Sequence, residues 1–454
     1  LNYSYQDRYL LEGQFRYDGS SKFAKGHRWG FFPSVSAGWR VSEEPFFKSV
    51  DALKFINQLK LRASYGVLGD DGSLEYDWAM GYTYPSTSGN AENGYYNQYV
   101  PGYVFGSQFI YGATPLALPN ENITWFKSKT FDVGVDLTAW DGLLGVSFDY
   151  FNRYRTGRFA RRTGSLPTVV GATAPRENLD SDRQIGLELE LTHRNKIGDL
   201  TYNLKGIATI TRQKYLTASE KGPWGNSYDR WRNDNLTNRY QGVQFGYTSA
   251  GRYNSWEDIW SYKIFKEKDV LPGDYKYEDW NGDGVIEPTY DRKVIGYEDP
   301  NFRFSLNNTL QYKNFALSFM LNSIVGGNNY YIMDNTSVIN TAFRADDVYR
   351  INMSAVRPYW TPDNGVNNAT GIYNSPAQSS GIYESRSFIR LQDLSLSYRF
   401  NKSLTNQLSI NDLQLFISGK NLYTWTKWSG WDPETGTSDI PLMRNLTVGL
   451  RLSL

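Results

Sequence analysis

The pattern closest to a chemical site is a run of oxygen-bearing side chains past the middle of the sequence. It reads Asp279-Trp280-Asn281-Gly282-Asp283-Gly284-Val285-Ile286-Glu287. Oxygen ligands at alternate positions, followed by a glycine that allows a sharp turn, suit a hard cation such as Ca²⁺. The sequence therefore predicts a structural Ca²⁺ in the 279–291 loop, with the candidate ligands Asp279, Asn281, Asp283, Glu287 and Asp291.

The same residues allow a second interpretation without metal. The twelfth position of the loop is Tyr290 rather than the glutamate that would bind Ca²⁺ through both oxygens, and Asp291 stands next to it. Asn-Gly and Asp-Gly pairs also form turns in which the side-chain oxygen accepts a backbone N–H. Both interpretations remain open, and nothing in the sequence requires a cofactor.

Aromatic side chains gather in turn-rich stretches between residues 224 and 280. A planar ring beside polar side chains suits the face of a sugar or a peptide side chain. Packing within the loops, or contact with a partner protein, is the alternative for any one of them. The neighbouring aromatics are Tyr253, Trp260, Tyr275 and Tyr277. The candidate substrate-binding residues are Trp224, Tyr228, Trp231, Trp256 and Trp280.

Enzymatic chemistry finds little support. His27 and His193 are the only histidines and there is no cysteine, which removes most nucleophile–base and thiolate-metal arrangements. The carboxylates of Asp149, Glu188 and Glu190 could in principle form a glycosidase pair. They occupy alternate positions of expected strands, where their ordinary role is to line a wet channel. We therefore predict that the protein is not an enzyme.

Nucleic-acid binding is equally unsupported. The formal net charge is +1, with 48 Lys and Arg against 47 Asp and Glu. The protein as a whole therefore has no strong positive electrostatic potential that would attract nucleic acid. No glycine-rich phosphate loop follows an expected strand, and no basic tract is interleaved with aromatic residues.

The elements that must position these residues are strands, because apolar and polar residues alternate with period two. For example, Phe131, Val133, Val135 and Leu137 alternate with polar or small residues. Thirteen such segments are expected, near 8–18, 30–42, 56–68, 128–139, 143–154, 183–194, 200–212, 240–252, 300–312, 314–325, 385–400, 410–420 and 444–454. Helical pieces are expected over 43–57 and 342–354.

The connections alternate between short and long. Tight turns are expected at Asp141-Gly142, Gly198-Asp199 and Lys313-Asn314. Long connections rich in Gly, Asn, Asp, Tyr and Trp are expected over 69–127, 155–182, 213–239, 253–299 and 326–384. A strand barrel of the outer membrane places its long loops on one side in this way.

Hydropathy fits such a barrel. The mean hydropathy is −0.56, and no stretch approaches the roughly 18 apolar residues of a membrane-spanning helix. Only alternate residues of a barrel strand face lipid, so its average stays polar. The fold class expected is all-β, an antiparallel transmembrane β-barrel. Its aromatic girdle would include Trp29, Trp39, Tyr65, Tyr150, Tyr398, Trp425 and Trp428.

Several segments resemble the SusC/RagA family of TonB-dependent outer-membrane transporters. They include the runs Arg16-Tyr17-Asp18-Gly19-Ser20-Ser21-Lys22-Phe23, Glu44-Pro45-Phe46, Leu59-Lys60-Leu61-Arg62-Ala63-Ser64-Tyr65-Gly66, Phe388-Ile389-Arg390-Leu391-Gln392-Asp393 and Trp431-Asp432-Pro433-Glu434. These runs extend from the first residues nearly to the last. The Asp-x-Asn-Gly-Asp-Gly run is also frequent in the family, which supports the Ca²⁺ prediction.

The resemblance implies a 22-stranded barrel preceded by a plug and an N-terminal extension. On that reading residues 1–454 are the C-terminal part of a single barrel domain, and the plug, the TonB box and the first strands are not in this chain. An odd number of expected strands agrees, since such barrels have an even number.

The resemblance also implies a location and a set of partners. These are the outer membrane of a Gram-negative bacterium and its lipid, a SusD-like surface lipoprotein acting as a lid, TonB acting through the plug, and the polypeptide that supplies the rest of the barrel. The implied function is import of a large nutrient, an oligosaccharide or else a peptide. Alternatives are a porin-like or adhesin barrel without active transport, and a soluble β-rich carbohydrate-binding protein.

Overall fold

The computed structural model describes most of the chain. The described residues are 1–72, 74–83, 102–115, 117–162, 166–170, 172–219, 235–265, 270–330, 363, 383–407, 410–428, 432–436 and 441–453.

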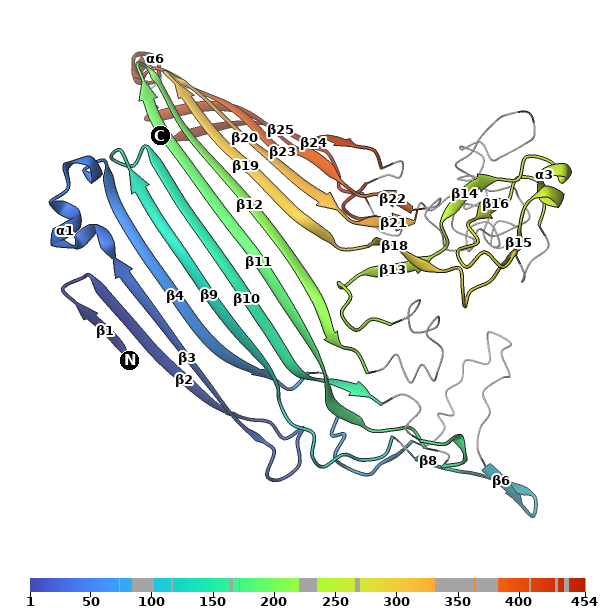
Figure 1. Cartoon of the computed structure of the whole chain (residues 1–454). Coiled ribbons are helices and arrows are strands. Elements are labelled where there is room, and N and C mark those ends of the chain that lie inside the picture. The colour runs from blue at the N-terminus through green and yellow to red at the C-terminus, as the bar shows by residue number, and fades with distance from the viewer. Residues whose placement is uncertain are drawn as a thin grey trace.

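One curved antiparallel sheet of 13 strands forms the body of the molecule. Its strand order follows the chain, so each strand pairs with its neighbours in the sheet (Figure 1). Among the described residues, β1 and β25 each have a single partner strand and form the two edges. The strands are β1 (Asn2–Tyr5), β2 (Tyr9–Gly19), β3 (Trp29–Arg40), β4 (Ile56–Asp70), β9 (Phe126–Ala139), β10 (Leu144–Arg161), β11 (Arg176–Ile197), β12 (Leu200–Thr217), β19 (Pro300–Tyr312), β20 (Phe315–Gly326), β23 (Phe388–Arg399), β24 (Asp412–Thr426) and β25 (Asn445–Ser453).

Register gives the sheet one apolar face and one polar face. Leu137 on β9 lies opposite Val146 on β10, which lies opposite Leu191 on β11. One residue along, Asp136, Ser147 and Glu190 are aligned in the same way. Because directly opposite residues share a face, the alternation in each strand adds up to two continuous surfaces.

The tight turns lie together at one end of the sheet. Asp141 and Gly142 both have positive φ, 53° and 83°, as a two-residue hairpin turn of this twist requires. Gly198 and Lys313 also have positive φ in their turns. The predicted turns are confirmed, and we call this end the turn end.

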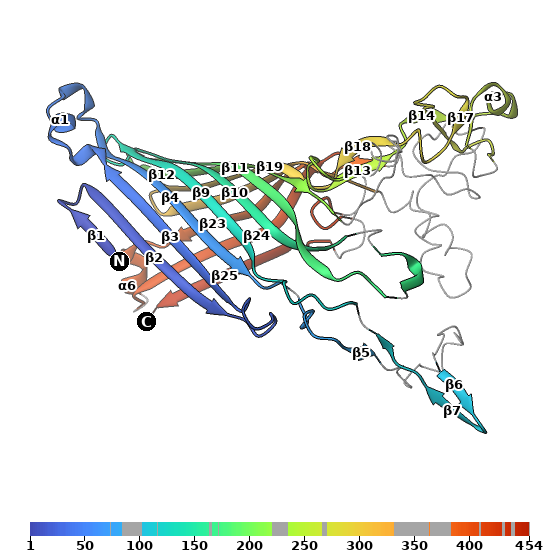
Figure 2. The same cartoon turned by 60° about the horizontal axis from the view of Figure 1, so that its bottom comes forward.

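The long connections lie at the opposite end, which we call the loop end (Figure 2). Their described parts carry six small two-stranded sheets, of which β15–β17 is parallel and the other five are antiparallel. Their strands are β5 (Tyr82–Thr83), β6 (Gly102–Phe105), β7 (Gln108–Tyr111), β8 (Thr114–Pro115), β13 (Val243–Gly246), β14 (Ser249–Arg252), β15 (Ile264–Phe265), β16 (Tyr275–Tyr277), β17 (Val285–Ile286), β18 (Lys293–Tyr297), β21 (Asn328–Tyr330) and β22 (Tyr383–Ser385).

Helices are short and lie outside the main sheet. Among the described residues, none is long and apolar enough to cross a bilayer. The helical elements are η1 (Val41–Glu43), α1 (Pro45–Lys48), η2 (Asp51–Leu53), η4 (Thr168–Val170), α3 (Trp256–Ser261) and α6 (Lys402–Gln407).

Two predicted elements are wrong. The segment 240–252 is not a strand of the main sheet; it breaks at Tyr247 and Thr248, and its parts form β13 and β14 at the loop end, which pair with two different strands. Gly242, with φ of 71°, precedes β13, and Gly251, with φ of 100°, lies within β14. The helix predicted over 43–57 ends after one turn, where Val50 is extended. The helix predicted over 342–354 lies outside the described residues.

Exposed aromatic side chains on the apolar face cluster near both ends of the strands. At the loop end of β2 and β3, Tyr17 stacks on Trp29 with ring centroids 5.2 Å apart. At the turn end, Phe55 stacks on Trp140 at 4.9 Å. The aromatic rings at the two ends form two bands that match the two interfaces of a bilayer, and exposed rings such as Phe131 also lie along the apolar face between them. Trp428 does not belong to them, because its side chain is buried at the loop end.

A buried carboxylate organises the first turn-end connection. Arg8 Nη1 donates to Glu44 Oε2 at 3.0 Å, and Trp39 Nε1 donates to Oε1 at 3.0 Å. Hydrogen bonds from Tyr9 and Trp39, followed by Arg8, outweigh the effect of burial and lower the pKa of Glu44 below its ordinary value of 4.5. Glu44 thus joins the β1–β2 turn to the end of β3.

Replacing Glu44 by Gln should lower the unfolding temperature at neutral pH, because Arg8 loses its charged partner. A carboxyl group with a lowered pKa stabilises the fold above its unfolded pKa, and the contribution disappears as pH falls through the folded pKa. The Glu44→Gln variant should lack this loss below about pH 4.5. Heat-dependent mobility on denaturing gels at pH 7 and at acidic pH measures both effects.

Glu43→Gln is the matched control, since the Glu43 side chain is more exposed and its partner Lys48 lies at the surface. An equal drop in unfolding temperature for the two variants would contradict the special role given to Glu44.

Candidate functional site

The polar face of the sheet carries a shared ion-pair network at its centre. Arg62 on β4 donates through Nε to Asp136 Oδ2 at 2.8 Å and through Nη2 to Asp149 Oδ2 at 2.8 Å. Ser147 Oγ donates to Asp136 Oδ1 at 2.8 Å and accepts from Arg62 Nη2 at 3.1 Å. One guanidinium therefore links three strands and neutralises two carboxylates on a wall that is otherwise lined with polar groups.

A glycine allows this network to form. Gly134 on β9 lies between Arg62 on β4 and Asp149 on β10 in the register. A Cβ at this position would lie 2.3 Å from Asp149 Oδ1 and 2.7 Å from Arg62 Cζ. The ion pair crosses the middle strand through the space that a side chain would fill. A second pair, Lys205–Glu190 at 2.8 Å, lies on the same face.

Further towards the loop end, charges pair around a fully buried carboxylate. Arg155 Nε and Arg158 Nη1 bind the two oxygens of Asp182 at 2.7 and 2.8 Å. Between the two arginines, Gly157 has φ of 72° and forms a bulge in β10. Asn178 donates to the carbonyl of Gly157 at 2.7 Å. The bulge bends β10 locally near its loop end, while its pairing with β11 continues to Arg161.

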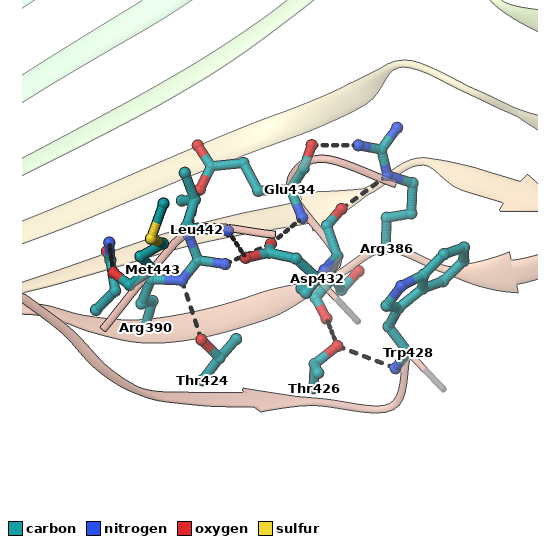
Figure 3. A network of polar contacts seen from close by, with 12 residues as sticks. Arg386, Arg390, Thr424, Thr426, Trp428, Asp432, Glu434, Leu442 and Met443 are labelled. Carbon is teal, nitrogen blue, oxygen red and sulfur yellow. Dashed lines mark hydrogen bonds and ion pairs between the residues drawn. The ribbon is translucent and has the colours of Figure 1, made fainter. Parts of the chain in front are cut away.

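A second buried network fastens the last long connection to the wall (Figure 3). Arg390 on β23 is 1% exposed; Nη2 donates to Asp432 Oδ1 and Nη1 to Glu434 Oε2, both at 2.6 Å. Its Nε donates to Thr424 Oγ1 at 3.0 Å. Arg386 Nε donates to the carbonyl of Pro433 at 2.8 Å. We call this set the Arg390 tether, and it holds residues 432–436 against β23 and β24.

The loop end also carries a compact unit with its own core, formed by residues 243–265 and 270–299. Tyr247, Tyr275, Tyr277 and Ile286 form a buried cluster. Tyr253 is buried as well, and burial raises its pKa to about 12. The tyrosines that stood beside the candidate substrate-binding residues in the sequence therefore hold this unit together and are not presented to a ligand.

The tryptophans of the unit remain available to a ligand. Trp256 is 50% exposed and Trp280 is 42% exposed, and Trp260, one turn after Trp256 on α3, is 76% exposed. The ammonium group of Lys293 lies 5.6 Å from the centre of the Trp280 ring. The other candidates, Trp224, Tyr228 and Trp231, lie outside the described residues.

The 279–291 loop satisfies its oxygens with protein donors. The Asp279 carboxylate accepts the backbone N–H of Gly282 and of Gly284 at 2.6 and 2.8 Å, and Lys263 Nζ lies 2.9 Å from it. Burial acts to raise the pKa of Asp279, but Lys263 and the two backbone donors outweigh it and lower that pKa.

Asp291 closes the other end of the loop. Its carboxylate accepts the backbone N–H of Trp280 at 2.7 Å and of Glu287 at 2.8 Å. Asn281 and Asp283 bond to each other and to the local backbone. Among the described residues, no group of three or more acidic or histidine side chains is arranged to hold a metal. These bonds are those of the turn without metal, and the Ca²⁺ site with ligands Asp279, Asn281, Asp283, Glu287 and Asp291 stays a prediction.

Comparison with known proteins decides what this wall belongs to. A family model described as TonB dependent receptor-like, beta-barrel, matches residues 1–422. The chain belongs to this family. It is therefore an outer-membrane β-barrel protein from a family of transporters rather than enzymes, which confirms the predicted fold class, location and lack of an enzymatic role.

Individual relatives extend this result over the whole chain. TonB-dependent receptor P3 of Formosa agariphila is 27% identical over 465 residues, which cover 99% of this chain and 43% of that protein. TonB-dependent receptor SusC of Bacteroides thetaiotaomicron is 27% identical over 473 residues, covering 100% of this chain and 43% of SusC. The chain thus spans less than half the length of these relatives. They confirm the resemblance to SusC/RagA proteins.

A solved structure has the same fold. The RagAB peptide importer in its open-open state superposes with a TM-score of 0.73 at 19% sequence identity, covering all of this chain and 46% of the matched chain. In this barrel family the apolar face of the sheet meets lipid and the polar face borders the interior.

Sequence reasoning placed some site residues and missed others. It assigned Asp149, Glu188 and Glu190 to the polar face, where Asp149 and Glu190 are paired with cations. It did not find the partners Arg62 and Arg390, although both lie in runs that carry the family resemblance. The strand phase of Arg62 could have placed it beside Asp149, whereas nothing in the sequence pairs Arg390 with Asp432.

Gly134→Ala should break the central network and destabilise the barrel by about 1–3 kcal/mol, the usual cost of forcing extra volume into a packed site. Gly206→Ala on β12 is the matched control, because a Cβ there meets nothing within 4 Å. Denaturant unfolding of both variants measures the difference. Equal stabilities would show that the Arg62–Asp149 contact does not depend on Gly134.

Arg390→Met should release the last connection, because Asp432 and Glu434 would be left without their cation. Breaking a buried pair in this way costs about 3–5 kcal/mol. Hydrogen exchange of residues 432–436 should accelerate while that of β19 and β20 stays unchanged. Arg399→Met serves as the control, since Arg399 is exposed on the same strand and lies 3.5 Å from Asp412. Unchanged exchange in the Arg390 variant would refute the tether.

Proposed function

We propose that this chain forms part of the wall and the extracellular vestibule of an active, TonB-dependent importer of a large nutrient. Membership of a transporter family supports this proposal, because the matched residues include the entire polar wall up to β24. The wall pairs its charges and keeps them partly accessible, as a water-filled passage requires and a dry core would not. Family membership also argues against the soluble carbohydrate-binding alternative.

The proposed cargo is an oligosaccharide. Trp256 and Trp280 present aromatic surface at the loop end, beside charged side chains that can bind hydroxyl groups. A peptide is the second candidate, and the observation that favours it is the shared fold with a peptide importer.

The proposed partners are a SusD-like surface lipoprotein that closes over the loop end, TonB, and the segments that complete the barrel and its plug. The small sheets β13–β18 and the unit around Tyr247 enlarge the loop end into a surface on which such a lipoprotein could rest. The resemblance to SusC/RagA proteins supports all three partners.

Uptake of labelled oligosaccharides by cells that make the protein together with its lipoprotein tests the proposal. Saturable uptake should fall more than about tenfold when a protonophore collapses the proton gradient that drives active transport. A tenfold fall in rate corresponds to a rise of about 1.4 kcal/mol in activation free energy. Undiminished uptake would favour the porin-like alternative. Uptake of labelled peptides alone would reject the oligosaccharide and keep the importer.

The double variant Trp256→Ala/Trp280→Ala should reduce oligosaccharide uptake severalfold, since each lost aromatic contact is worth about 0.5–1.5 kcal/mol. Trp140→Ala is the matched control, because Trp140 is equally exposed, at 51%, but lies at the turn end. Equal reductions in both variants, at equal amounts of assembled protein, would contradict a substrate-contact role.

A further inference from the structure

A row of cations crosses the apolar face of the sheet at its loop end. Lys129 on β9 lies opposite Tyr154 on β10, which lies opposite Arg183 on β11, which lies opposite Lys214 on β12. Directly opposite residues share a face, so these four side chains form one line across four strands. We call this line, with the nearby Lys127 and Arg212, the basic row.

The basic row begins where the apolar rows end. Lys129 precedes the exposed Phe131 by two positions, and Arg183 precedes the exposed Ile185 by two. Residues two apart in a strand share a face, so the cations continue the lipid-facing surface rather than the polar wall. The row therefore stands at the edge of the hydrocarbon, on the side of the long loops.

Between the row and the turn end, no carboxylate of these four strands lies on the face of the row. Asp132, Asp136, Asp149, Glu188 and Glu190 all occupy polar-face positions in the register. Asp182, next to Arg183, also lies on the polar face, where it binds Arg155 and Arg158. Among the described residues, none of the ion pairs involves a cation of the basic row. Arg183 donates to the neutral Asn152 at 3.0 Å.

Arg212, next to the row on β12, is held between two aromatic rings. The guanidinium of Arg212 lies 4.7 Å from the ring centre of Tyr240 and 5.0 Å from that of Tyr297. At the loop end of β2 and β3, by contrast, the apolar face carries the stacked rings of Tyr17 and Trp29.

Cations on a lipid-facing surface are costly at the bilayer centre, at about 2–4 kcal/mol each, but cost about 0–1 kcal/mol near the interface. Their long side chains can reach the headgroup layer while the stems stay in hydrocarbon. An anionic headgroup layer attracts each such cation. Several unpaired cations in one line are therefore complementary to negative charge in the leaflet beside the long loops.

We propose that the basic row binds the phosphorylated headgroup of a lipid in the outer leaflet. This site is separate from the proposed substrate route, because it lies on the opposite face of the sheet. The geometry assigns Lys129, Arg183 and Lys214 the contact with phosphate, and Arg212 a supporting position fixed by its two tyrosines.

The test uses protein extracted from outer membranes in mild detergent and titrated with a phosphorylated glycolipid (lipid A) or the same glycolipid without its phosphates. Wild-type protein should bind the phosphorylated form more tightly. The variant Lys129→Gln/Arg183→Gln/Lys214→Gln should weaken binding on the order of 100-fold, since each cation near a charged surface contributes roughly fivefold. The charge-conserving variant Lys129→Arg/Arg183→Lys/Lys214→Arg should retain binding.

Arg153→Gln is the matched control, because Arg153 lies between Asn152 and Tyr154 on β10 but faces the polar side. Its lipid affinity should equal that of wild type. Equal weakening in this control, equal affinity for the dephosphorylated lipid, or unaltered affinity in the triple glutamine variant would each overturn the proposal. Displacement of the lipid by inorganic phosphate would also overturn it, in favour of a site for free anions.

Discussion

A polypeptide in hydrocarbon must pair every backbone N–H and C=O group with another part of the chain, because no water is present to do so. A continuous antiparallel sheet meets this condition over most of its area, and its period of two then separates the side chains into two populations. One population meets lipid and the other borders the interior. The ion-pair networks, the aromatic bands and the basic row all take their positions from this single separation.

The polar population is organised by cross-strand geometry. Arg62 reaches Asp149 only because the strand between them offers a glycine, so the identity of one residue depends on two others that lie on different strands. The same principle operates at Gly157, where an added residue in β10 sets Arg155 and Arg158 around Asp182. Glycines and bulges in this wall therefore give charged side chains of neighbouring strands the space to pair, in addition to bending the sheet.

Twelve of the thirteen strand segments could be predicted from the sequence, because alternation is a local property that needs no knowledge of neighbours. The exceptions have physical reasons. β1 has only four residues, too few to display a period, and 240–252 alternates like a membrane strand although it breaks at Tyr247 and Thr248 and divides between two small sheets. Prediction was weaker in the loops. Tyr275 and Tyr277 have the sequence surroundings of exposed aromatic residues, but in the structure they are buried in a small hydrophobic cluster of the loop end. The pairing of Arg390 with Asp432, 42 residues away, depends on the path of a loop that no periodicity describes.

The Arg390 tether has a consequence for the way the sheet is assembled. A slip of one residue in the pairing of β23 would turn every side chain of that strand to the opposite face. The guanidinium would then enter the hydrocarbon, and its two carboxylate partners would remain behind in the interior. An incorrectly aligned hairpin would therefore be strongly disfavoured before the last strand is added. The tether thus acts as a built-in check on the alignment of the C-terminal strands as they insert.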